Sequence, residues 1–218
     1  MAKPNSKRAY LLLLLLIPVA FVLLLKQGSF RSNETLPIYG NRFLAPDQTD
    51  TVYHTVGEFS LIDQKGNVFT QDTVKGKIRI ANFFFARCQG VCPKMNSNVL
   101  MVYDKYKNSP DIVFISHTVD PTNDSAEVLD TYAQQIDASY KRWYFVTGKY
   151  DDIAEVQNQY LLPKADGSST DQISHSQYII LVDDKDRVRG AYDGLNINQV
   201  LKLRDDIKLL VNERNKPK

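Results

Sequence analysis

Apolar and polar positions along residues 51–211 follow two patterns, one typical of strands and one typical of helices. A near-continuous apolar run over residues 78–85 predicts a strand buried on both faces, and residues 111–117 and 143–147 are interpreted as further core strands. Residues 59–70 and 177–192 each contain two apolar stretches around a polar turn, which predicts two β-hairpins. We expect the second turn, at residues 183–186, to be solvated.

Apolar residues recur at helical spacing between these strands. The predicted helices cover residues 93–106, 124–133, 150–160 and 200–211. The order along the chain is then hairpin, strand, helix, strand, helix, strand, helix, hairpin and helix. This order predicts an α/β fold in which helices flank a mixed sheet, with a β-hairpin at the start of the domain.

The chain has only two cysteines, Cys88 and Cys92, and they follow the apolar run at residues 78–85. Three residues separate them, and Pro93 fits the first turn of the helix that comes next. Cys92 should therefore lie at or beside a helix N-terminus, where the dipole favours its thiolate. A cysteine pair between a buried strand and its helix is the thioredoxin arrangement, so we expect a thioredoxin-like sheet.

This pair allows more than one chemistry. One helical turn places two Cα atoms about 6 Å apart, which suits a disulfide as well as two thiolate ligands. Two thiolates and an imidazole suit Cu(I) and other soft or borderline ions, and our candidate for the imidazole is His175. Without a second cysteine pair, structural zinc is not favoured. A static disulfide and an ordinary loop histidine are the alternatives.

The other two histidines and one acidic turn are weaker candidates. His117 ends a predicted strand near the same sheet edge, and we expect it to be structural or to support the site. His54 precedes the predicted core, and we expect it to have no role. Asp120 and Pro121 are interpreted as a turn and the entry to a helix.

Residues 9–25 form an apolar segment of seventeen residues without a charge. As a helix it would be about 25 Å long, which crosses a bilayer core of about 30 Å if flanking residues snorkel. Lys3, Lys7 and Arg8 precede it, so we expect a transmembrane signal anchor with residues 1–8 in the cytoplasm and the rest exported. No small-x-small cleavage site follows; a cleaved signal peptide and a buried helix are the alternatives.

Residues 26–50 contain many residues that interrupt any periodicity. We interpret them as a tether, either a spacer or an irregular arm packed on a domain that comprises residues 51–218. The net charge of +2 is close to neutral, and no run of Lys or Arg follows the N-terminus. We therefore do not expect nucleic acid as a partner.

Residues 51–211 resemble the Sco/SenC family of membrane-anchored, thioredoxin-fold proteins that handle copper for cytochrome c oxidase assembly. Three segments carry the resemblance, in the family's order: FFFARC through CP at residues 83–93, SHTVDP at residues 116–121, and SHS with the strand after it at residues 174–182. The resemblance implies that Cys88, Cys92 and His175 are copper ligands.

The departures from the family pattern are local. Gln89 and Gly90 replace the Pro and acidic residue that often follow the first cysteine, and Ser174 replaces an Asp that often precedes the histidine. These departures leave all three candidate ligands in place.

By this resemblance, the first functional hypothesis is a metallochaperone. It would bind copper as Cu(I), with Cu(II) as an alternative, and deliver it to the copper-site subunit of cytochrome c oxidase. Further partners would be another copper chaperone or a thioredoxin-like reductant. The expected location is the bacterial inner membrane, single-pass, with the domain facing the periplasm or the cell exterior.

The second hypothesis is an enzyme, a thiol–disulfide oxidoreductase that uses Cys88 and Cys92 to reduce cysteines of a partner protein. Oxidoreductases of this fold typically carry two residues between the cysteines, whereas this chain has three. His175, which can bind a metal, enters the late strand where those enzymes carry a cis-proline. Both features favour metal binding, and the two roles are compatible with each other.

Overall fold

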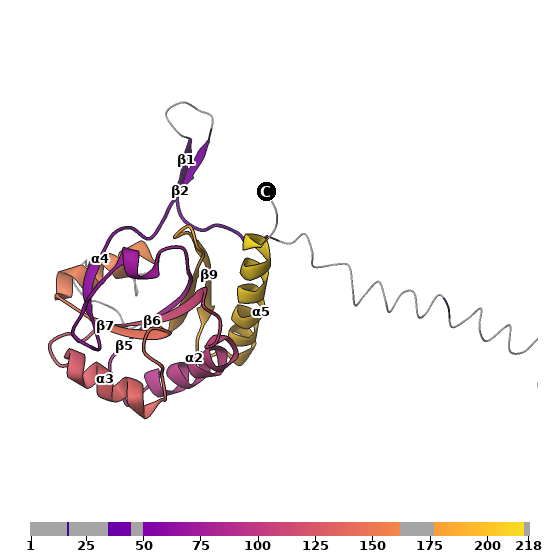
Figure 1. The fold of residues 1–218 in the computed structure, drawn as a ribbon. Helices are drawn as coiled ribbons and strands as arrows, with labels where there is room; N and C mark the ends of the chain where they lie inside the picture. The colour runs from indigo at the N-terminus through magenta and orange to yellow at the C-terminus, as the bar shows by residue number, and fades with distance from the viewer. Residues whose placement is uncertain (1–16, 18–34, 45–49, 162–176, 216–218) are drawn as a thin grey trace, which may run out of the picture. The chain divides into compact units, whose positions relative to one another are not determined.

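The computed structural model describes residues 35–44, 50–161 and 177–215, together with the single residue Ile17. The chain divides into two compact units, Met1–Thr35 and Leu36–Lys218, and the strands and helices described below belong to the second (Figure 1). Apart from Ile17, the predicted anchor lies outside the described residues. Within the described ranges, no helix is both long enough and apolar enough to cross a membrane.

A mixed sheet of seven strands, in the order β4–β3–β7–β6–β5–β8–β9, forms the centre of the described domain. Its strands are β3 (Ser60–Asp63), β4 (Val68–Thr70), β5 (Ile78–Phe84), β6 (Ile112–Thr118), β7 (Trp143–Thr147), β8 (Tyr178–Val182) and β9 (Val188–Asp193). β5 and β6 are parallel, as are β6 and β7, whereas β8 runs antiparallel to β5. The predicted mixed sheet and its two hairpins, β3–β4 and β8–β9, are confirmed.

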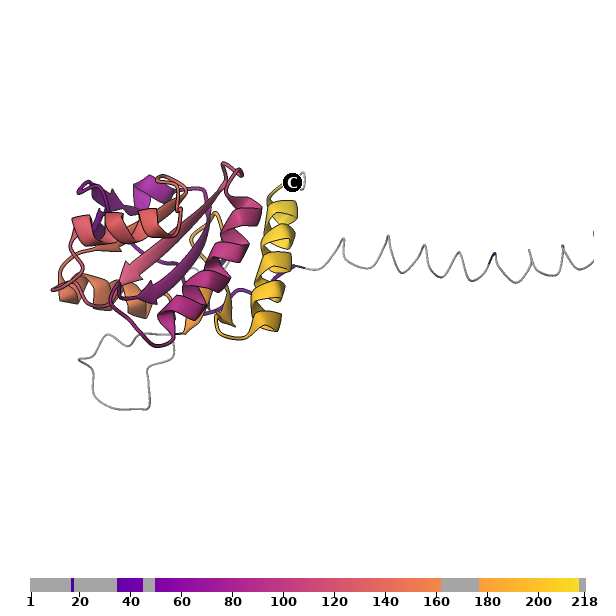
Figure 2. The same ribbon diagram turned by 90° about the horizontal axis from the view of Figure 1, so that it is seen from below.

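Helices cover both faces of this sheet (Figures 1 and 2). They are α2 (Cys92–Tyr106), α3 (Ala126–Gln135), α4 (Tyr150–Gln159) and α5 (Ile197–Arg214), and a short 3-10 helix, η1 (Gln71–Val74), follows β4. Apolar residues of α2, α3 and α5 form one core with the sheet. Those of α4 form a second core on the opposite face, together with residues of β3, β4 and η1.

β5 contributes to both cores. Ile80 and Phe84 belong to the core under α2, while Ala81 and Phe83 belong to the core on the α4 face. This is the side-chain alternation of a strand. The continuous apolar run arises because both faces are covered, as predicted for residues 78–85.

The start of the domain is attached to β9 and α5 through Arg189, which is 4% exposed. Its guanidinium donates to the backbone carbonyls of Leu36 and Pro37, at 2.6 and 3.0 Å, and pairs with Glu213 at 2.8 Å. The Leu36 amide in turn donates to Glu213. Of the two interpretations of the tether, these contacts fit a packed arm for the part that begins at Leu36.

Arg189 also corrects the prediction of a solvated turn in the β8–β9 hairpin. Asp183 is only 2% exposed, and its carboxylate pairs with Arg187 at 2.7 Å and with Arg189 at 2.9 Å. Burial opposes ionisation of Asp183, but its hydrogen bonds with the two arginines outweigh this and lower its pKa. Asp183 is thus the centre of a buried group of ion pairs, which composition alone did not reveal, while Asp184 and Asp186 are half-buried and Lys185 is exposed.

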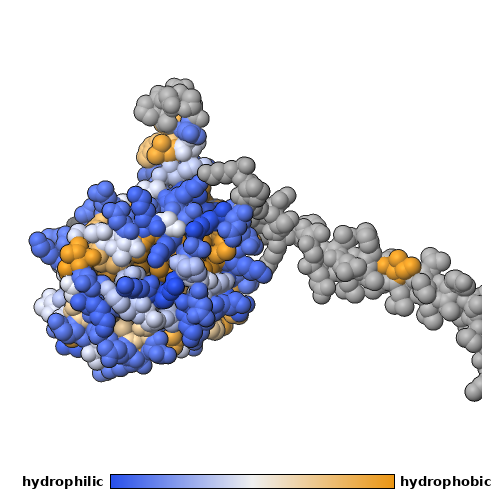
Figure 3. Space-filling model, viewed as in Figure 1, coloured by the Kyte–Doolittle hydropathy of each residue, from blue (hydrophilic) through white to orange (hydrophobic). Residues whose placement is uncertain are grey.

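A second departure from the sequence analysis is a small strand pair that links the end of the predicted tether to the start of the predicted domain. β1 (Arg42–Leu44) and β2 (Thr51–Tyr53) form a separate two-stranded antiparallel sheet. Phe43 and Leu44 are 63% and 68% exposed, so this hairpin adds no apolar residue to the core (Figure 3). Strands of three residues rich in polar neighbours carry little periodicity, which is why the sequence did not predict them.

The role of Arg189 can be tested with Arg189→Met, which keeps the length of the side chain and removes its charge. The change leaves buried Asp183 with one partner fewer and two carbonyls of the arm without their donor. We expect the free energy of unfolding to fall by about 3 kcal/mol. Hydrogen exchange should also accelerate at the Tyr39 amide, which bonds to β9. Both are measurable by denaturant titration and mass spectrometry.

A matched control is Arg204→Met, because Arg204 pairs with Asp205 at 3.6 Å where both side chains are exposed. This substitution should lower the free energy of unfolding by less than about 0.5 kcal/mol. Similar losses in the two variants would contradict the proposed role of Arg189 in holding the arm.

Candidate functional site

The two cysteines lie where β5 ends and α2 begins, as the sequence predicted. Both thiols are free in this structure. Cys88 lies in the connecting turn, where its amide donates to the Phe85 carbonyl at 3.2 Å, and its side chain is half-buried. Cys92 is the first residue of α2, is 2% exposed and belongs to the core under that helix. One thiol is therefore accessible and the other is enclosed.

The two thiols also differ in how readily they ionise. Burial raises the pKa of Cys88, but hydrogen bonds from the Cys92 side chain and from the Gly90, Val91 and Cys92 backbone outweigh it, and the pKa is lowered. Burial, together with the hydrogen bond to Cys88, raises the pKa of Cys92 to about 12. The prediction that the helix start favours the Cys92 thiolate is wrong, because burial of Cys92 outweighs the hydrogen bonds that favour its charged form.

Asp124, in the loop that follows β6, holds the cysteine turn in place. It is fully buried, and its Oδ2 accepts from the Ala86 amide at 3.0 Å and from the Thr118 hydroxyl at 2.5 Å. The Val119 amide donates to the Phe84 carbonyl at 2.8 Å, which continues the link between β5 and β6. The sequence analysis placed Asp124 only at the start of a predicted helix, because nothing in the local sequence marks a carboxylate that bonds to the turn after another strand.

Asp120 has the turn role that the sequence predicted. Its carboxylate accepts from the Asn123 side chain at 2.8 Å, and its amide donates to Thr118. Arg87, next to the first cysteine, lies 3.6 Å from Asp120, but this pair is exposed and contributes little to stability.

His175 lies outside the described residues, but the chain two residues after it is well placed. β8 runs antiparallel to β5, with Ile179 opposite Asn82, so β8 begins at the sheet edge where the cysteine turn starts. The Gln177 carbonyl accepts from the Gly194 amide at 2.8 Å, and the Gly194 carbonyl accepts from Asn98 of α2 at 2.7 Å. Gln177 is thereby connected to the cysteine helix.

Glycine is required at position 194 for this connection. A Cβ there would lie 2.8 Å from the Met95 side chain and 2.9 Å from the Gln177 carbonyl oxygen. Met95 is three residues after Cys92, on the same side of α2. The contact therefore brings the start of β8 close to the first turn of the helix. No group of three potential metal ligands exists within the described part of the chain, which includes both cysteines but not His175.

Comparison with known proteins identifies the family to which this fold and this cysteine turn belong. The family model SCO1/SenC matches residues 47–211, well over half of the chain. The chain belongs to the SCO1/SenC family. A relative from Bacillus subtilis (strain 168), named as a SCO1 protein homolog, is 27% identical over 164 residues, which cover 73% of this chain and 84% of the relative.

Solved structures of the family share the fold. A SCO1/SenC family lipoprotein from Bacillus anthracis matches with a TM-score of 0.63 and 28% identity, over 71% of this chain and 94% of that one. BsSco, described as a member of the Sco family of cytochrome c oxidase assembly proteins with a disulfide switch, matches with a TM-score of 0.57 and 25% identity, over 70% and 92%. ScoI of Bradyrhizobium japonicum, solved with copper bound, matches with a TM-score of 0.52 and 25% identity, over 68% and 97%.

The described histidines of this SCO1/SenC chain lie away from the cysteines. His117 is fully buried on the α4 face. Its ring stacks on that of Phe83, with the ring centroids 4.9 Å apart, and meets the ring of Tyr160 edge-on, with the centroids 5.4 Å apart. Burial, with a smaller effect of Arg79, lowers its pKa to about 3. Its role is packing, one of the two predicted alternatives. The Nε2 of His54 lies 2.7 Å from the Gln159 carbonyl at the end of α4, again remote from the site.

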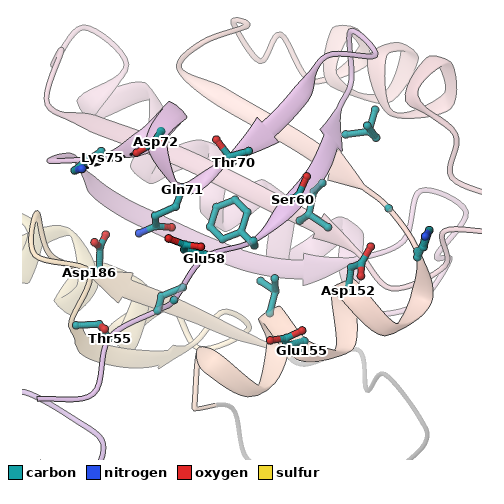
Figure 4. Close-up of a pocket in the computed structure, with 18 residues that line it drawn as sticks. Thr55, Glu58, Ser60, Thr70, Gln71, Asp72, Lys75, Asp152, Glu155 and Asp186 are labelled. Atoms are coloured by element: carbon teal, nitrogen blue, oxygen red, sulfur yellow. Dashed lines mark ion pairs between the residues drawn. The ribbon is translucent and has the colours of Figure 1, made fainter.

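A large cavity of about 1110 Å³ lies elsewhere, beside β3, β4, η1 and the start of α4 (Figure 4). Its lining carries five carboxylates, those of Glu58, Asp72, Asp152, Glu155 and Asp186. Neither cysteine lines it. The cysteine site is therefore separate from this cavity.

The asymmetry of the thiols predicts an order of alkylation. Iodoacetamide should modify Cys88 at least about tenfold faster than Cys92 in the reduced protein, because only Cys88 is both accessible and thiolate-prone. The rate at Cys88 should reach its plateau at a lower pH than a free thiol does. Fragmentation of the tryptic peptide 88–94 locates the label. Equal rates at the two sulfurs would refute the asymmetry.

Burial of His117 predicts a pH dependence of stability. The pKa of the imidazole is about 6.5 when free and about 3 in the folded protein. On acidification the unfolded chain takes up a proton that the folded one does not, so stability present above pH 6.5 is lost as the pH falls toward 3. The loss between pH 7 and pH 5 should be about 2 kcal/mol.

His117→Phe keeps a flat ring at this position and removes the titration. The pH-dependent loss in wild type should exceed that in the variant by about 2 kcal/mol between pH 7 and 5, measured by urea unfolding. Identical pH profiles for the two proteins would show that His117 is not buried in its neutral form.

Proposed function

We propose that this chain is a membrane-anchored copper metallochaperone that binds copper through Cys88, Cys92 and His175. It would deliver the metal to the copper centre of cytochrome c oxidase during assembly. The observation that carries the proposal is the free cysteine pair at the start of α2, next to the strand end from which the chain leads back to His175. The copper-bound family relative from Bradyrhizobium japonicum supports the choice of metal.

The donor set fits Cu(I). Thiolates and imidazole are the soft and borderline ligands that this ion prefers. Hydrogen bonds from the Cys92 side chain and from the backbone amides of residues 90–92 lower the pKa of Cys88, so this ligand loses its proton more readily than a free thiol does. Cys92 must lose its proton when the metal binds, because the metal and the proton compete for the same lone pair.

The length of the chain limits how far His175 can lie from the start of β8. Consecutive Cα atoms are about 3.8 Å apart, so the Cα of His175 lies within about 7.6 Å of the Cα of Gln177. Gln177 is held near Met95 through the contacts of Gly194. This distance is compatible with an imidazole that shares a metal with the cysteine pair.

Transfer would proceed by ligand exchange and needs no change in oxidation state. A thiolate or imidazole of the target approaches from the side of Cys88, the accessible ligand, and each new metal bond replaces one bond to this protein. Cys92 is enclosed by the core and would release its bond late. Its raised pKa helps here, since the freed sulfur takes up a proton readily.

A thiol–disulfide reductase is the second candidate, and the thiol asymmetry favours it specifically. The Cys88 thiolate attacks a disulfide of the partner and expels one partner thiolate. The Cys92 thiolate then displaces the second partner sulfur from Cys88, and the Cys88–Cys92 disulfide forms. Two electrons pass from this pair to the partner. The pattern of an accessible, ionised nucleophile and a buried second thiol is what this sequence of steps needs.

Location and partners follow from the predicted anchor at residues 9–25. It would place the domain outside a bacterial inner membrane, on the periplasmic or external side, where the copper-site subunit of the oxidase is accessible. Another copper chaperone or a thioredoxin-like reductant would supply the metal or the electrons. The oxidising compartment permits both the reduced and the disulfide state.

The copper assignment is tested by Cu(I) competition against a chelator of known pH behaviour. Reduced wild type should bind one copper, and replacing both cysteines by serine should abolish tight binding, because an alcohol is a poor ligand for a soft ion. From pH 7 to pH 5 wild type should lose more affinity than His175→Ala, because only wild type has an imidazole ligand to protonate.

His54→Ala is the matched control and should behave like wild type, because the His54 imidazole lies at the Gln159 carbonyl at the end of α4, remote from the cysteines. Parallel curves for wild type and His175→Ala would remove His175 from the ligand set. Stoichiometric copper in the double serine variant would overturn the site. If His175→Ala keeps thiol exchange with a model disulfide and cells with this variant still mature the oxidase, the reductase is the main activity.

A further inference from the structure

The loop that joins β6 to α3, residues 118–124, is closed by hydrogen bonds within itself. The Thr118 hydroxyl accepts from the Asp120 amide at 3.0 Å and donates to Asp124 Oδ2 at 2.5 Å. The amides of Asn123 and Asp124 both donate to the Asp120 carbonyl, at 3.0 and 2.9 Å. The Asp124 carboxylate is therefore held at a fixed position beside the end of β5.

This loop is bonded to the residues that lead into the first cysteine. The Val119 amide donates to the carbonyl of Phe84, the last residue of β5, at 2.8 Å. The Ala86 amide donates to Asp124 Oδ2 at 3.0 Å. The bond to Asp124 thus extends the fixed part of the chain beyond the end of the strand, to within two residues of Cys88.

The two cysteines are held by different parts of the structure. Cys92 is 2% exposed and packs in the core under α2, whereas Cys88 is half-buried in the turn before that helix. The residues between them, 89–91, are all exposed. Packing of α2 therefore fixes the second sulfur, while the position of the first depends on the end of β5 and on the loop bonded to it.

Asp124 is a costly residue for a purely structural role. It is fully buried, and its Oδ1 has no hydrogen-bond partner among the described residues. Burial of a carboxylate with an unbonded oxygen lowers stability. The start of α3 does not need it, because the Ser125 hydroxyl caps that helix by accepting from the Val128 amide. What Asp124 adds to the fold is its bond to the cysteine turn.

We propose that Asp124 is a positioning residue for copper binding, which holds Cys88 in place through the Ala86 amide before the metal binds. A ligand that is already ordered loses less conformational entropy on binding. Groups that orient metal ligands typically contribute about 10- to 100-fold to the affinity for the metal. The inference rests on the proposed copper site and adds to it a residue outside the ligand set.

The test is Cu(I) competition against a chelator, on the reduced full chain. Asp124→Ala removes the acceptor of the Ala86 amide, and the copper affinity should fall at least about tenfold. Asp124→Asn should bind copper nearly as tightly as wild type, because its amide group can still accept from Ala86 and donate to Thr118. An affinity in Asp124→Asn as low as in Asp124→Ala would overturn the role of this hydrogen bond.

Asp63→Ala is the matched control, because it also removes a buried carboxylate that closes a turn. Asp63 is 3% exposed and accepts from the Lys65 and Asn67 amides, both at 2.9 Å. It lies in β3, which β7 and β6 separate from β5. This variant should lose stability and keep its copper affinity. A loss of affinity in Asp124→Ala no larger than that in Asp63→Ala would overturn the proposal.

Thr118→Val provides a second variant if Asp124→Ala does not fold. Valine has a similar shape but lacks the hydroxyl that donates to Asp124, so the carboxylate keeps only its bond to Ala86. We expect a smaller loss of copper affinity in the same direction. Wild-type affinity in this variant would likewise overturn the proposal.

Hydrogen exchange gives a readout that does not depend on copper. In the reduced, metal-free chain the Cys88 amide donates to the Phe85 carbonyl, within the turn that Asp124 holds. Its exchange should be at least about tenfold faster in Asp124→Ala and unchanged in Asp63→Ala. An unchanged rate in Asp124→Ala would overturn this inference alone, whereas failure of wild type to bind copper would overturn the proposed function.

Discussion

The pairing of β5 with a parallel strand on one side and an antiparallel strand on the other is the constraint on which the site depends. All seven residues of β5 are buried, so their backbone groups must bond to β6 and β8. Parallel β6 brings its carboxyl end, and with it Asp124, to the edge where the cysteine turn starts. Antiparallel β8 brings its beginning to the same edge. One strand thus assembles three separate parts of the chain around two sulfurs.

The two cysteines differ in their environment: Cys88 is partly exposed and Cys92 is buried. Cys88 accepts hydrogen bonds from backbone amides and is accessible to solvent. Cys92 is buried in the core, which raises its pKa. A helix N-terminus usually stabilises an anion on its first residues, but here burial of the first residue outweighs the dipole. The same asymmetry suits metal transfer, where one bond must open before the other, and thiol exchange, where one sulfur must attack before the other. This is why geometry supports both activities.

Periodicity predicted the sheet, the flanking helices and the position of the cysteine pair, because these depend on local spacing and on which faces are covered. It did not predict the contacts that Asp124, Asn96 and Tyr132 make with partners 14 to 38 residues away along the chain. Nor did it predict that Asp183 is buried, since its second arginine becomes a partner only after the hairpin closes. Family resemblance supplied His175, which is a loop histidine by spacing alone. Contacts that form only in the folded chain leave no periodic trace in sequence.

The three residues between the cysteines have a different freedom from the rest of the site. Gln89, Gly90 and Val91 are exposed, and a Cβ at Gly90 would meet only the Cys88 sulfur, at an ordinary contact distance of 3.9 Å. Gly90 and Val91 supply their backbone amides to Cys88, and every residue except proline carries such an amide. Their side chains are therefore open to evolutionary drift and to engineering of metal preference without a loss of folding. In this motif the cysteines and their backbone hydrogen bonds maintain the site, while the exposed side chains between them can vary.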